Sequence, residues 1–313
     1  MAVLRRRNAV LAAAVAVCVA AGIVVAYVID SRGFTARHVQ LNDGGIWAIS
    51  DRDGLIGRAN LPAGTLDTAL ELPGGAQQNG QLDVVQDGAA VVARDRAGGK
   101  LYPVDVATGQ VLADAGISDG ADAELALGGG TAALLDPDSG RLWATRYDPD
   151  QGLTSLAALG AKARPAAQLG SRGGAATPAL AVGTDGTIRA LSAAGKLATV
   201  EAHGDGLSKA RYRQLHASFR APQLTAVGSD VLVLDATTGA VLLPGGRTAS
   251  IGVRDAAARL QQPGPSAHDA LIASSTALYA VRLGSGTVRR LTGAGTGAPA
   301  APVPVGRSEE HTS

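Results

Sequence analysis

The feature that most constrains this chain is a recurring pattern of short apolar runs separated by turns rich in glycine and aspartate. It is clearest between residues 82 and 109, where apolar runs are separated by Gln86-Asp87-Gly88 and by a second polar turn at 95–99. Asp and Gly tolerate the positive φ that tight hairpins require, so the pattern predicts antiparallel strands joined by short turns. One such unit cannot bury its faces alone, and it therefore needs neighbouring copies.

Six copies of this pattern can be traced along the sequence. They begin at residues 38, 82, 124, 179, 224 and 270. A repeat of roughly 40 to 45 residues that encodes three or four short strands is the signature of a β-propeller, in which each copy forms one blade. We therefore predict an all-β fold, a β-propeller of about six four-stranded blades over residues 38–306, with a seventh begun at 301–306.

The alternative fold is a two-sheet sandwich, which is also built from short strands at regular spacing. A sandwich gives no reason for a glycine turn and an Asp-x-x-Ser/Thr-Gly turn to recur in the same order. Those turns favour the propeller.

Composition limits both the partners and the covalent chemistry of the chain. The 313 residues carry a net charge of +1, so there is no overall signal for a nucleic-acid partner. Cys18 is the only cysteine, which excludes an intrachain disulfide. We expect stability to come from packing.

The N-terminal residues have the pattern of a membrane anchor. Residues 9–29 contain no Asp, Glu, Lys or Arg and match the ~20 residues that a helix needs to cross a bilayer. The apolar residues expected to contact lipid include Ala9, Val10, Leu11, Val15, Val17, Ile23, Val24, Val25 and Val28. Because Arg5-Arg6-Arg7 outweigh Arg32, the positive-inside rule places residues 1–8 in the cytoplasm and the propeller outside the plasma membrane, after a linker at 30–37.

The N-terminal sequence is also compatible with two other arrangements. Val19-Ala20-Ala21 is an acceptable signal-peptide cleavage site, although the apolar run continues past it. A lipoprotein is disfavoured because Val17, directly before Cys18, is larger than the residue that lipid-modifying cleavage normally accepts. All three arrangements place the rest of the chain outside the cytoplasm.

The last seven residues, Arg307-Ser308-Glu309-Glu310-His311-Thr312-Ser313, depart abruptly from the preceding composition. They resemble the translation of a short-read sequencing adapter. We therefore expect 307–313 to be a non-native tail and the natural protein to continue beyond Gly306.

The chain resembles the N-terminal part of actinobacterial membrane-anchored surface proteins that contain fibronectin type III domains. The resemblance rests on residues 33–39, on the run 82–100 and on Gly128-Gly129-Gly130-Thr131 leading to Leu135-Asp136-Pro137. It implies a membrane-spanning N-terminus, a propeller and further modules downstream. These are scaffold motifs, and no functional residue is carried over from the family.

The sequence stretches that resemble catalytic or metal-binding motifs favour structural roles. Aspartate-rich turns at 51–54 and 136–140 lack the further oxygen ligands and terminal Glu of a twelve-residue calcium loop, so we interpret them as turns. The stretch 135–143 resembles the Trp-docking turn of quinoprotein dehydrogenase propellers, but its spacing is one residue short. The glycine-rich run 293–297 precedes prolines rather than a helix, and the histidines lack metal-ligand spacing. We predict no catalytic residue, no metal and no cofactor.

One basic stretch suggests a binding surface. Cations alternate with aromatic residues over 209–220, and such a surface suits an anionic glycan or wall polymer. The contact residues would be Lys209, Arg211, Tyr212, Arg213 and Arg220. Edge strands also carry charges simply to discourage pairing, so a solvated outer strand is the alternative interpretation.

The sequence therefore predicts a noncatalytic scaffold or binding module at the cell surface, with a membrane on one side and a cell-wall glycan or protein as its ligand. Two enzymatic alternatives stay open. One is a carbohydrate-active enzyme with catalysis in a C-terminal region, and the other is a quinoprotein-like dehydrogenase.

Overall fold

The computed structural model describes residues 45–50, 55–60, 65–73, 82–112, 117–118, 122–160, 162–170, 177–215, 218–293 and 298–303. The chain divides into two compact units, 1–40 and 41–313, and every described residue belongs to the second. The predicted anchor, the linker and the predicted strand at 38–41 lie outside the described residues. Within the described part, no helix is long and apolar enough to span a membrane.

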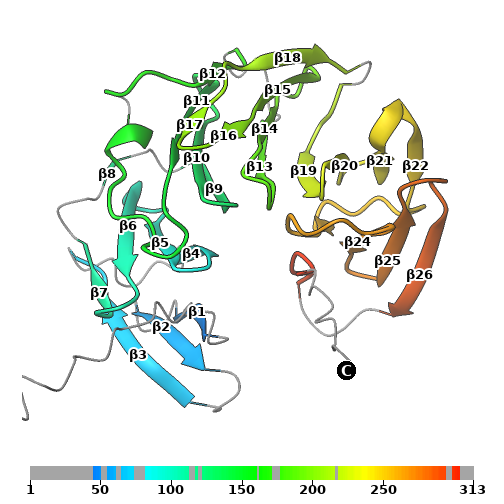
Figure 1. The fold of residues 1–313 in the computed structure, drawn as a ribbon. Helices are drawn as coiled ribbons and strands as arrows, with labels where there is room; N and C mark the ends of the chain where they lie inside the picture. The colour runs from blue at the N-terminus through cyan, green and yellow to red at the C-terminus, as the bar shows by residue number, and fades with distance from the viewer. Residues whose placement is uncertain are drawn as a thin grey trace, which may run out of the picture. The chain divides into compact units, whose positions relative to one another are not determined.

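The described residues form antiparallel sheets that follow one another in chain order (Figure 1). The first sheet consists of β1 (Gly45–Ser50), β2 (Leu55–Asn60) and β3 (Thr65–Glu71). The second consists of β4 (Leu82–Asp87), β5 (Ala90–Asp95), β6 (Lys100–Asp105) and β7 (Gln110–Val111), and β8 (Ile117–Ser118) also pairs with β6. The third consists of β9 (Glu124–Gly128), β10 (Thr131–Asp136), β11 (Arg141–Arg146) and β12 (Ala167–Gln168).

The later sheets repeat this plan. The fourth sheet consists of β13 (Ala179–Val182), β14 (Ile188–Leu191), β15 (Lys196–Val200) and β18 (Arg211–Gln214), and a small hairpin of β16 (Ala202–His203) and β17 (Gly206–Leu207) lies between β15 and β18 in the sequence. The next sheet consists of β19 (Pro222–Val227), β20 (Asp230–Asp235), β21 (Ala240–Leu242) and β22 (Thr248–Ser250). The last described sheet consists of β23 (Arg259–Leu260), β24 (Asp269–Ala273), β25 (Ala277–Arg282) and β26 (Val288–Gly293). Within the described residues, two short 3-10 helices, η2 (Ala157–Leu159) and η3 (Pro244–Gly246), lie in the connections.

The hydrophobic core lies between successive sheets. Leu134 of β10 and Trp143 of β11 pack with Val92 of the preceding sheet. Leu135, the next residue of β10, packs with Ile188 of the following sheet. Alternate residues of one strand thus face two different neighbours, as the pleat requires. Each sheet is covered by the next, which explains why the repeat must recur.

The first strands of consecutive sheets contact one another. β4 contacts β1 and β9, β13 contacts β9 and β19, and β19 contacts β23. We call β4, β9, β13, β19 and β23 the inner strands. Because each begins a new sheet, they bring residues that are distant in the sequence into one surface.

Glutamine side chains connect some of these strands through the backbone. Gln223 Oε1 accepts from the N–H of Leu260 at 2.7 Å, and its Nε2 donates to the Ala258 carbonyl at 2.6 Å. Gln86 Oε1 likewise accepts from the N–H of Trp47 at 3.1 Å. A carboxamide both donates and accepts hydrogen bonds, so it can bond the backbone N–H and C=O groups of an inner strand at an edge where no further strand pairs with it.

The predicted strands of copies two to five are present, and the structure differs from the prediction in three places. The sixth copy was expected to start at 270–273, but β23 pairs with β24 and precedes it in the sheet. A further strand, β12, forms between the third and fourth copies and pairs with β11, where the repeat pattern predicts no strand. Residues 301–303, expected to begin a seventh copy, form no strand, because Pro302 has no N–H to donate and only its carbonyl bonds, to the N–H of Gln262.

Candidate functional site

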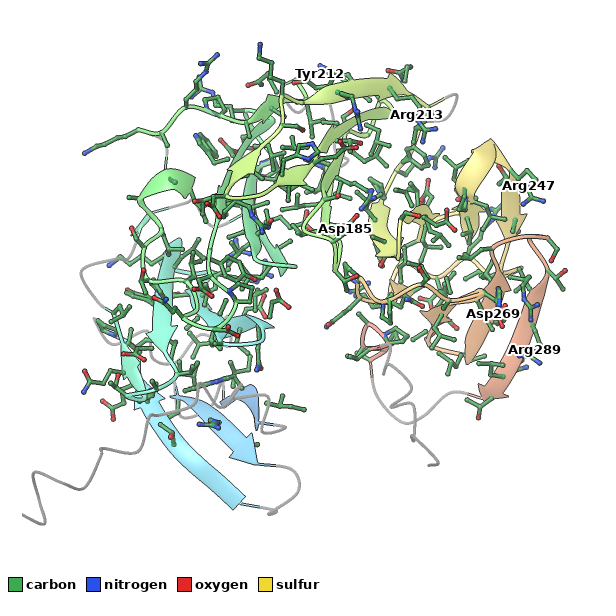
Figure 2. The ribbon with its side chains drawn as sticks, viewed as in Figure 1. Asp185, Tyr212, Arg213, Arg247, Asp269 and Arg289 are labelled. Carbon is green, nitrogen blue, oxygen red and sulfur yellow. The ribbon has the colours of Figure 1, made fainter. Side chains whose placement is uncertain are left out.

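The predicted basic stretch forms an exposed edge strand. Arg211, Tyr212 and Arg213 lie in β18, whose four residues are all exposed, and β18 pairs with β15 on one side (Figure 2). Side chains alternate along a strand, so Arg211 and Arg213 share a face and Tyr212 points to the other. Lys209 and Arg220 are also exposed. The structure thus presents two arginines of this stretch together.

Some of these side chains already have partners within the chain. Arg211 forms an ion pair with Glu201. The Tyr212 hydroxyl accepts from the N–H of Gln168 at 3.0 Å, and Lys196 Nζ lies 4.4 Å from the centre of the Tyr212 ring. Lys196 also donates to the Gln168 carbonyl at 2.9 Å. Tyr212 therefore helps to hold β12 beside β18, whereas Arg213 and Arg220 have no side-chain ion pair within the described residues.

A concave site lies elsewhere, at the beginnings of the inner strands. This cavity has a volume of about 400 Å³ and is called the inner-strand pocket below. Its lining consists of Glu124, Ala179, Leu180, Pro222, Gln223, Leu224, Arg259, Leu260, Gln261, Gln262, Pro263 and Ala301. Four inner strands, β9, β13, β19 and β23, contribute residues, so the pocket exists only when consecutive sheets are packed together.

Two glutamine side chains of this pocket form hydrogen bonds with the backbone of the surrounding strands. Gln223 bonds the backbone of 258–260, as described above, and Gln261 Oε1 accepts from the N–H of Leu271 at 2.7 Å. Arg259 Nη1 donates to the carbonyls of Ala257 and Ala258 at 3.1 and 3.0 Å. These bonds hold the wall in place. Gln262 is exposed, and its side chain makes no hydrogen bond within the described residues.

Glu124 is the acidic group of the pocket. Burial raises the pKa of Glu124 to about 7. The hydrogen bond from the N–H of Leu180 to the carboxylate and the positive charges of Arg96 and Arg94 lower the pKa, but by less than burial raises it. A carboxyl group with this pKa exchanges its proton near neutral pH and offers either a donor or an acceptor to a ligand. The sequence did not single out Glu124, because its burial depends on β13, which is remote in the chain.

This pKa predicts a pH-dependent stability. The folded protein binds the Glu124 proton more tightly than the unfolded chain, whose Glu pKa is about 4.5, so the stabilising effect is complete below pH 4.5 and is lost as the pH rises to about 7. Across that window we expect the free energy of unfolding to fall by on the order of 2 kcal/mol more for the wild type than for Glu124→Gln. Urea unfolding at several pH values measures this difference; parallel pH profiles for the two proteins would contradict it.

The pocket's chemistry suits binding through hydrogen bonds. It offers one carboxyl, one guanidinium and a free carboxamide against apolar walls of leucine, proline and alanine. Glycoside hydrolysis normally needs two carboxyl groups, and among the described residues that line the pocket there is one, Glu124. Within the described residues there is also no group of three or more His, Cys, Asp or Glu side chains that could hold a metal ion.

Comparison with solved structures identifies the class of fold. The chain is similar to Hsv2 of Kluyveromyces lactis, with 10% identity, a TM-score of 0.50, and coverage of 77% of this chain and 71% of that one. It is also similar to the dihydro-heme d1 dehydrogenase NirN, solved in complex with DHE, with 12% identity, a TM-score of 0.51, and coverage of 80% and 53%. Both are β-propeller proteins.

This protein therefore contains a β-propeller module, as its repeated turns predicted. At these identities the similarity establishes the fold and not the activity of either neighbour. No protein-family model matches the sequence, and no curated protein matches it.

Proposed function

We propose that this protein is a β-propeller binding module, displayed outside the cell by the membrane anchor at residues 9–29, and that its ligand occupies the inner-strand pocket. The observation that carries the proposal is the pocket itself. Four inner strands position Glu124, Arg259 and Gln262 around one cavity, and backbone bonds hold its wall. A preorganised wall lowers the entropy lost when a ligand binds.

The anchor and the surface-protein resemblance support an extracytoplasmic ligand, and we propose a cell-wall glycan or a surface protein. A glycan presents hydroxyls that match the carboxyl and carboxamide of the pocket, and apolar ring faces that match its proline and leucine walls. The propeller acts by display, and its chemistry is binding rather than bond cleavage. Fibronectin type III modules beyond Gly306 remain part of this proposal.

A second contact is proposed on β18. Arg213 and Arg220 are exposed and have no ion-pair partner within the described residues, so their guanidinium groups are available to anionic polymer. We propose that these two arginines, assisted by Lys209 and Arg211, add a charge-dependent contact to the same wall material. The Tyr212 ring contributes less, because Lys196 covers one of its faces.

Retention on insoluble cell wall tests both contacts. The full chain is incubated with wall that carries its anionic polymer and with wall from which that polymer has been extracted. We expect Ala301→Trp, which fills the inner-strand pocket from a residue outside any strand, to reduce retention on both materials at least tenfold. The triple change of Arg211, Arg213 and Arg220 to Ser should reduce retention only on polymer-bearing wall.

The two variants serve as controls for each other, because each leaves the other site intact. Equal retention of the wild type and Ala301→Trp on both materials would reject the pocket as the ligand site. Unchanged retention of the triple variant would reject the β18 contact. External protease added to intact cells should degrade the propeller, and protection of the propeller in intact cells would reject the proposed orientation.

A further inference from the structure

A second cavity lies on the last described sheet and is separate from both sites above. It has a volume of about 290 Å³ and is called the β24–β26 pocket. Its lining consists of Asp269, Ala280, Arg282, Ser285, Thr287 and Arg289. Figure 2 shows Asp269 and Arg289 on neighbouring parts of this sheet. Neither the repeat pattern nor the proposed function gives these residues a role.

The strand register places these side chains on one face of the sheet. Asp269 lies opposite Arg282, and Ala280 lies opposite Arg289. Tyr279 and Val281, which alternate with Ala280 and Arg282 along β25, are buried in the core shared with β19–β22. The pocket therefore lies on the face turned away from that core. Ala280 is its floor, because a methyl group leaves space between two long side chains.

The charges of the pocket favour an anion. Arg282 donates through Nε and Nη2 to the two oxygens of Asp269, which fixes the plane of its guanidinium group. Arg289 is exposed, and its side chain makes neither a hydrogen bond nor an ion pair within the described part of the chain. Two guanidinium groups against one carboxylate leave one positive charge over an uncharged floor. Arginine is the side chain that best matches the planar oxygens of phosphate and carboxylate groups.

The hydroxyl groups of the pocket are held in position by the neighbouring sheet. The Ser285 and Thr287 hydroxyls lie 2.8 Å apart in the turn between β25 and β26. Arg247, which lies just before β22, donates to the carbonyls of Leu283 and Gly284 in the same turn. The turn is thereby attached to its neighbour, and Arg247 acts as a positioning residue for the two hydroxyls.

We propose that the β24–β26 pocket binds a hydroxylated anion, a phosphate or carboxylate group with a hydroxyl on an adjacent carbon. Arg289 and the free Nη1 of Arg282 bind the anionic group. Ser285 and Thr287 supply neutral hydrogen bonds, and Asp269 accepts from the ligand's hydroxyl. Asp269 disfavours a bare anion, so the hydroxyl is needed for tight binding. The cavity is large enough for such a molecule, since a water molecule in the liquid takes up about 30 Å³.

Isothermal titration calorimetry on the full chain tests this site with defined probes. Glycerol 3-phosphate combines an anion with an adjacent hydroxyl, inorganic phosphate has only the anion, and glycerol has only hydroxyls. Glycerate replaces the phosphate by a carboxylate, with a hydroxyl on the adjacent carbon, and so distinguishes the two sources of negative charge. We expect glycerol 3-phosphate or glycerate to bind at least fivefold more tightly than inorganic phosphate, and glycerol not to bind. Equal affinity for inorganic phosphate and for both hydroxylated anions would overturn the proposal.

Matched variants separate a built site from general charge. Arg289→Gln should weaken binding at least tenfold, whereas Arg290→Gln removes the same charge from the next residue of β26, outside the pocket, and should change it less than twofold. Ala280→Leu fills the floor without changing charge and should abolish binding. Equal losses for the Arg289 and Arg290 variants, or full binding by Ala280→Leu with its fold intact by circular dichroism, would overturn the proposal. None of these outcomes depends on the inner-strand pocket.

Discussion

Replacing Gly140 by alanine is expected to lower the free energy of unfolding by about 3 kcal/mol. Gly140 ends the turn Asp136–Gly140 between β10 and β11 and has a φ of +66°. A left-handed conformation costs a side-chain-bearing residue about 1–2 kcal/mol, and overpacking adds about 1–3 kcal/mol. An added Cβ would lie 2.7 Å from the Gly170 carbonyl carbon and 3.0 Å from its nitrogen. These are backbone atoms, so the chain that follows β12 would have to move.

Gly109 is the matched control for this change. It ends a similar turn, with a φ of +62°, but a Cβ there would meet only the side chain of Thr68, at 3.2 Å. Gly109→Ala should therefore cost about 1 kcal/mol, mostly from the backbone conformation. Urea unfolding followed by the fluorescence of the two buried tryptophans, Trp47 and Trp143, measures the Gly140 variant, and circular dichroism compares both variants. Equal urea midpoints for the two variants would contradict the expectation that the backbone of Gly170, close to Gly140, makes the Gly140 substitution more destabilising.

Replacing Asp235 by alanine is expected to lower the free energy of unfolding by about 3 kcal/mol, because several part-buried hydrogen bonds to one carboxylate are lost together. Asp235 is 5% exposed and accepts from the N–H of Arg220 at 3.0 Å and of Ala221 at 3.4 Å. It also accepts from the Thr237 N–H at 3.2 Å and from its hydroxyl at 2.7 Å. The carboxylate therefore attaches the chain before β19 to the end of β20.

Asp136→Ala is the control for Asp235→Ala. Asp136 has the equivalent place in the β10–β11 turn, but the bonds it accepts come from Asp138 and Ser139 within its own turn. We expect a cost of about 1 kcal/mol, the ordinary worth of a partly exposed turn bond. Midpoints of urea unfolding measure both variants. A larger loss for Asp136→Ala than for Asp235→Ala would contradict the assigned role of Asp235.

The Asp235 effect should also depend on pH. Burial alone would raise the pKa of Asp235, but hydrogen bonds from Arg220, Thr237 and Ala221 outweigh burial and leave the pKa below its ordinary value of 3.8. A lowered folded pKa stabilises the protein above pH 3.8, and the effect is lost as the pH falls further. The difference in stability between the wild type and Asp235→Ala should therefore shrink below about pH 4.

Much of the fold could be predicted because its turns are local. The turn at 136–140 needs an aspartate that accepts from nearby N–H groups and a glycine with positive φ, and both requirements are visible in five consecutive residues. The same five-residue pattern recurs at 235–239. Strand β12 was missed because it has two residues, too few for an alternating pattern, and is held by the remote Tyr212 and Lys196.

The candidate sites could not be predicted to the same degree. The basic stretch of β18 was recognised because its residues lie close together in the sequence, but the ion pair of Arg211 with Glu201 and the hydrogen bond of Tyr212 with Gln168 were not visible there. Glu124 begins an ordinary strand, and its altered pKa arises from burial against a different sheet. The residues of the β24–β26 pocket come from three strands and from the turn between β25 and β26, and the strand register decides which strand residues share a face.

The order of residues alone determined that the chain forms short antiparallel strands, at which positions most of the turns lie, and that repeated units cover one another. These properties follow from backbone conformation and alternating hydrophobicity within a few residues. Only the tertiary structure decided which polar side chains share a cavity and which bond one another. Burial and charge interactions act through space, so they depend on which strands become neighbours.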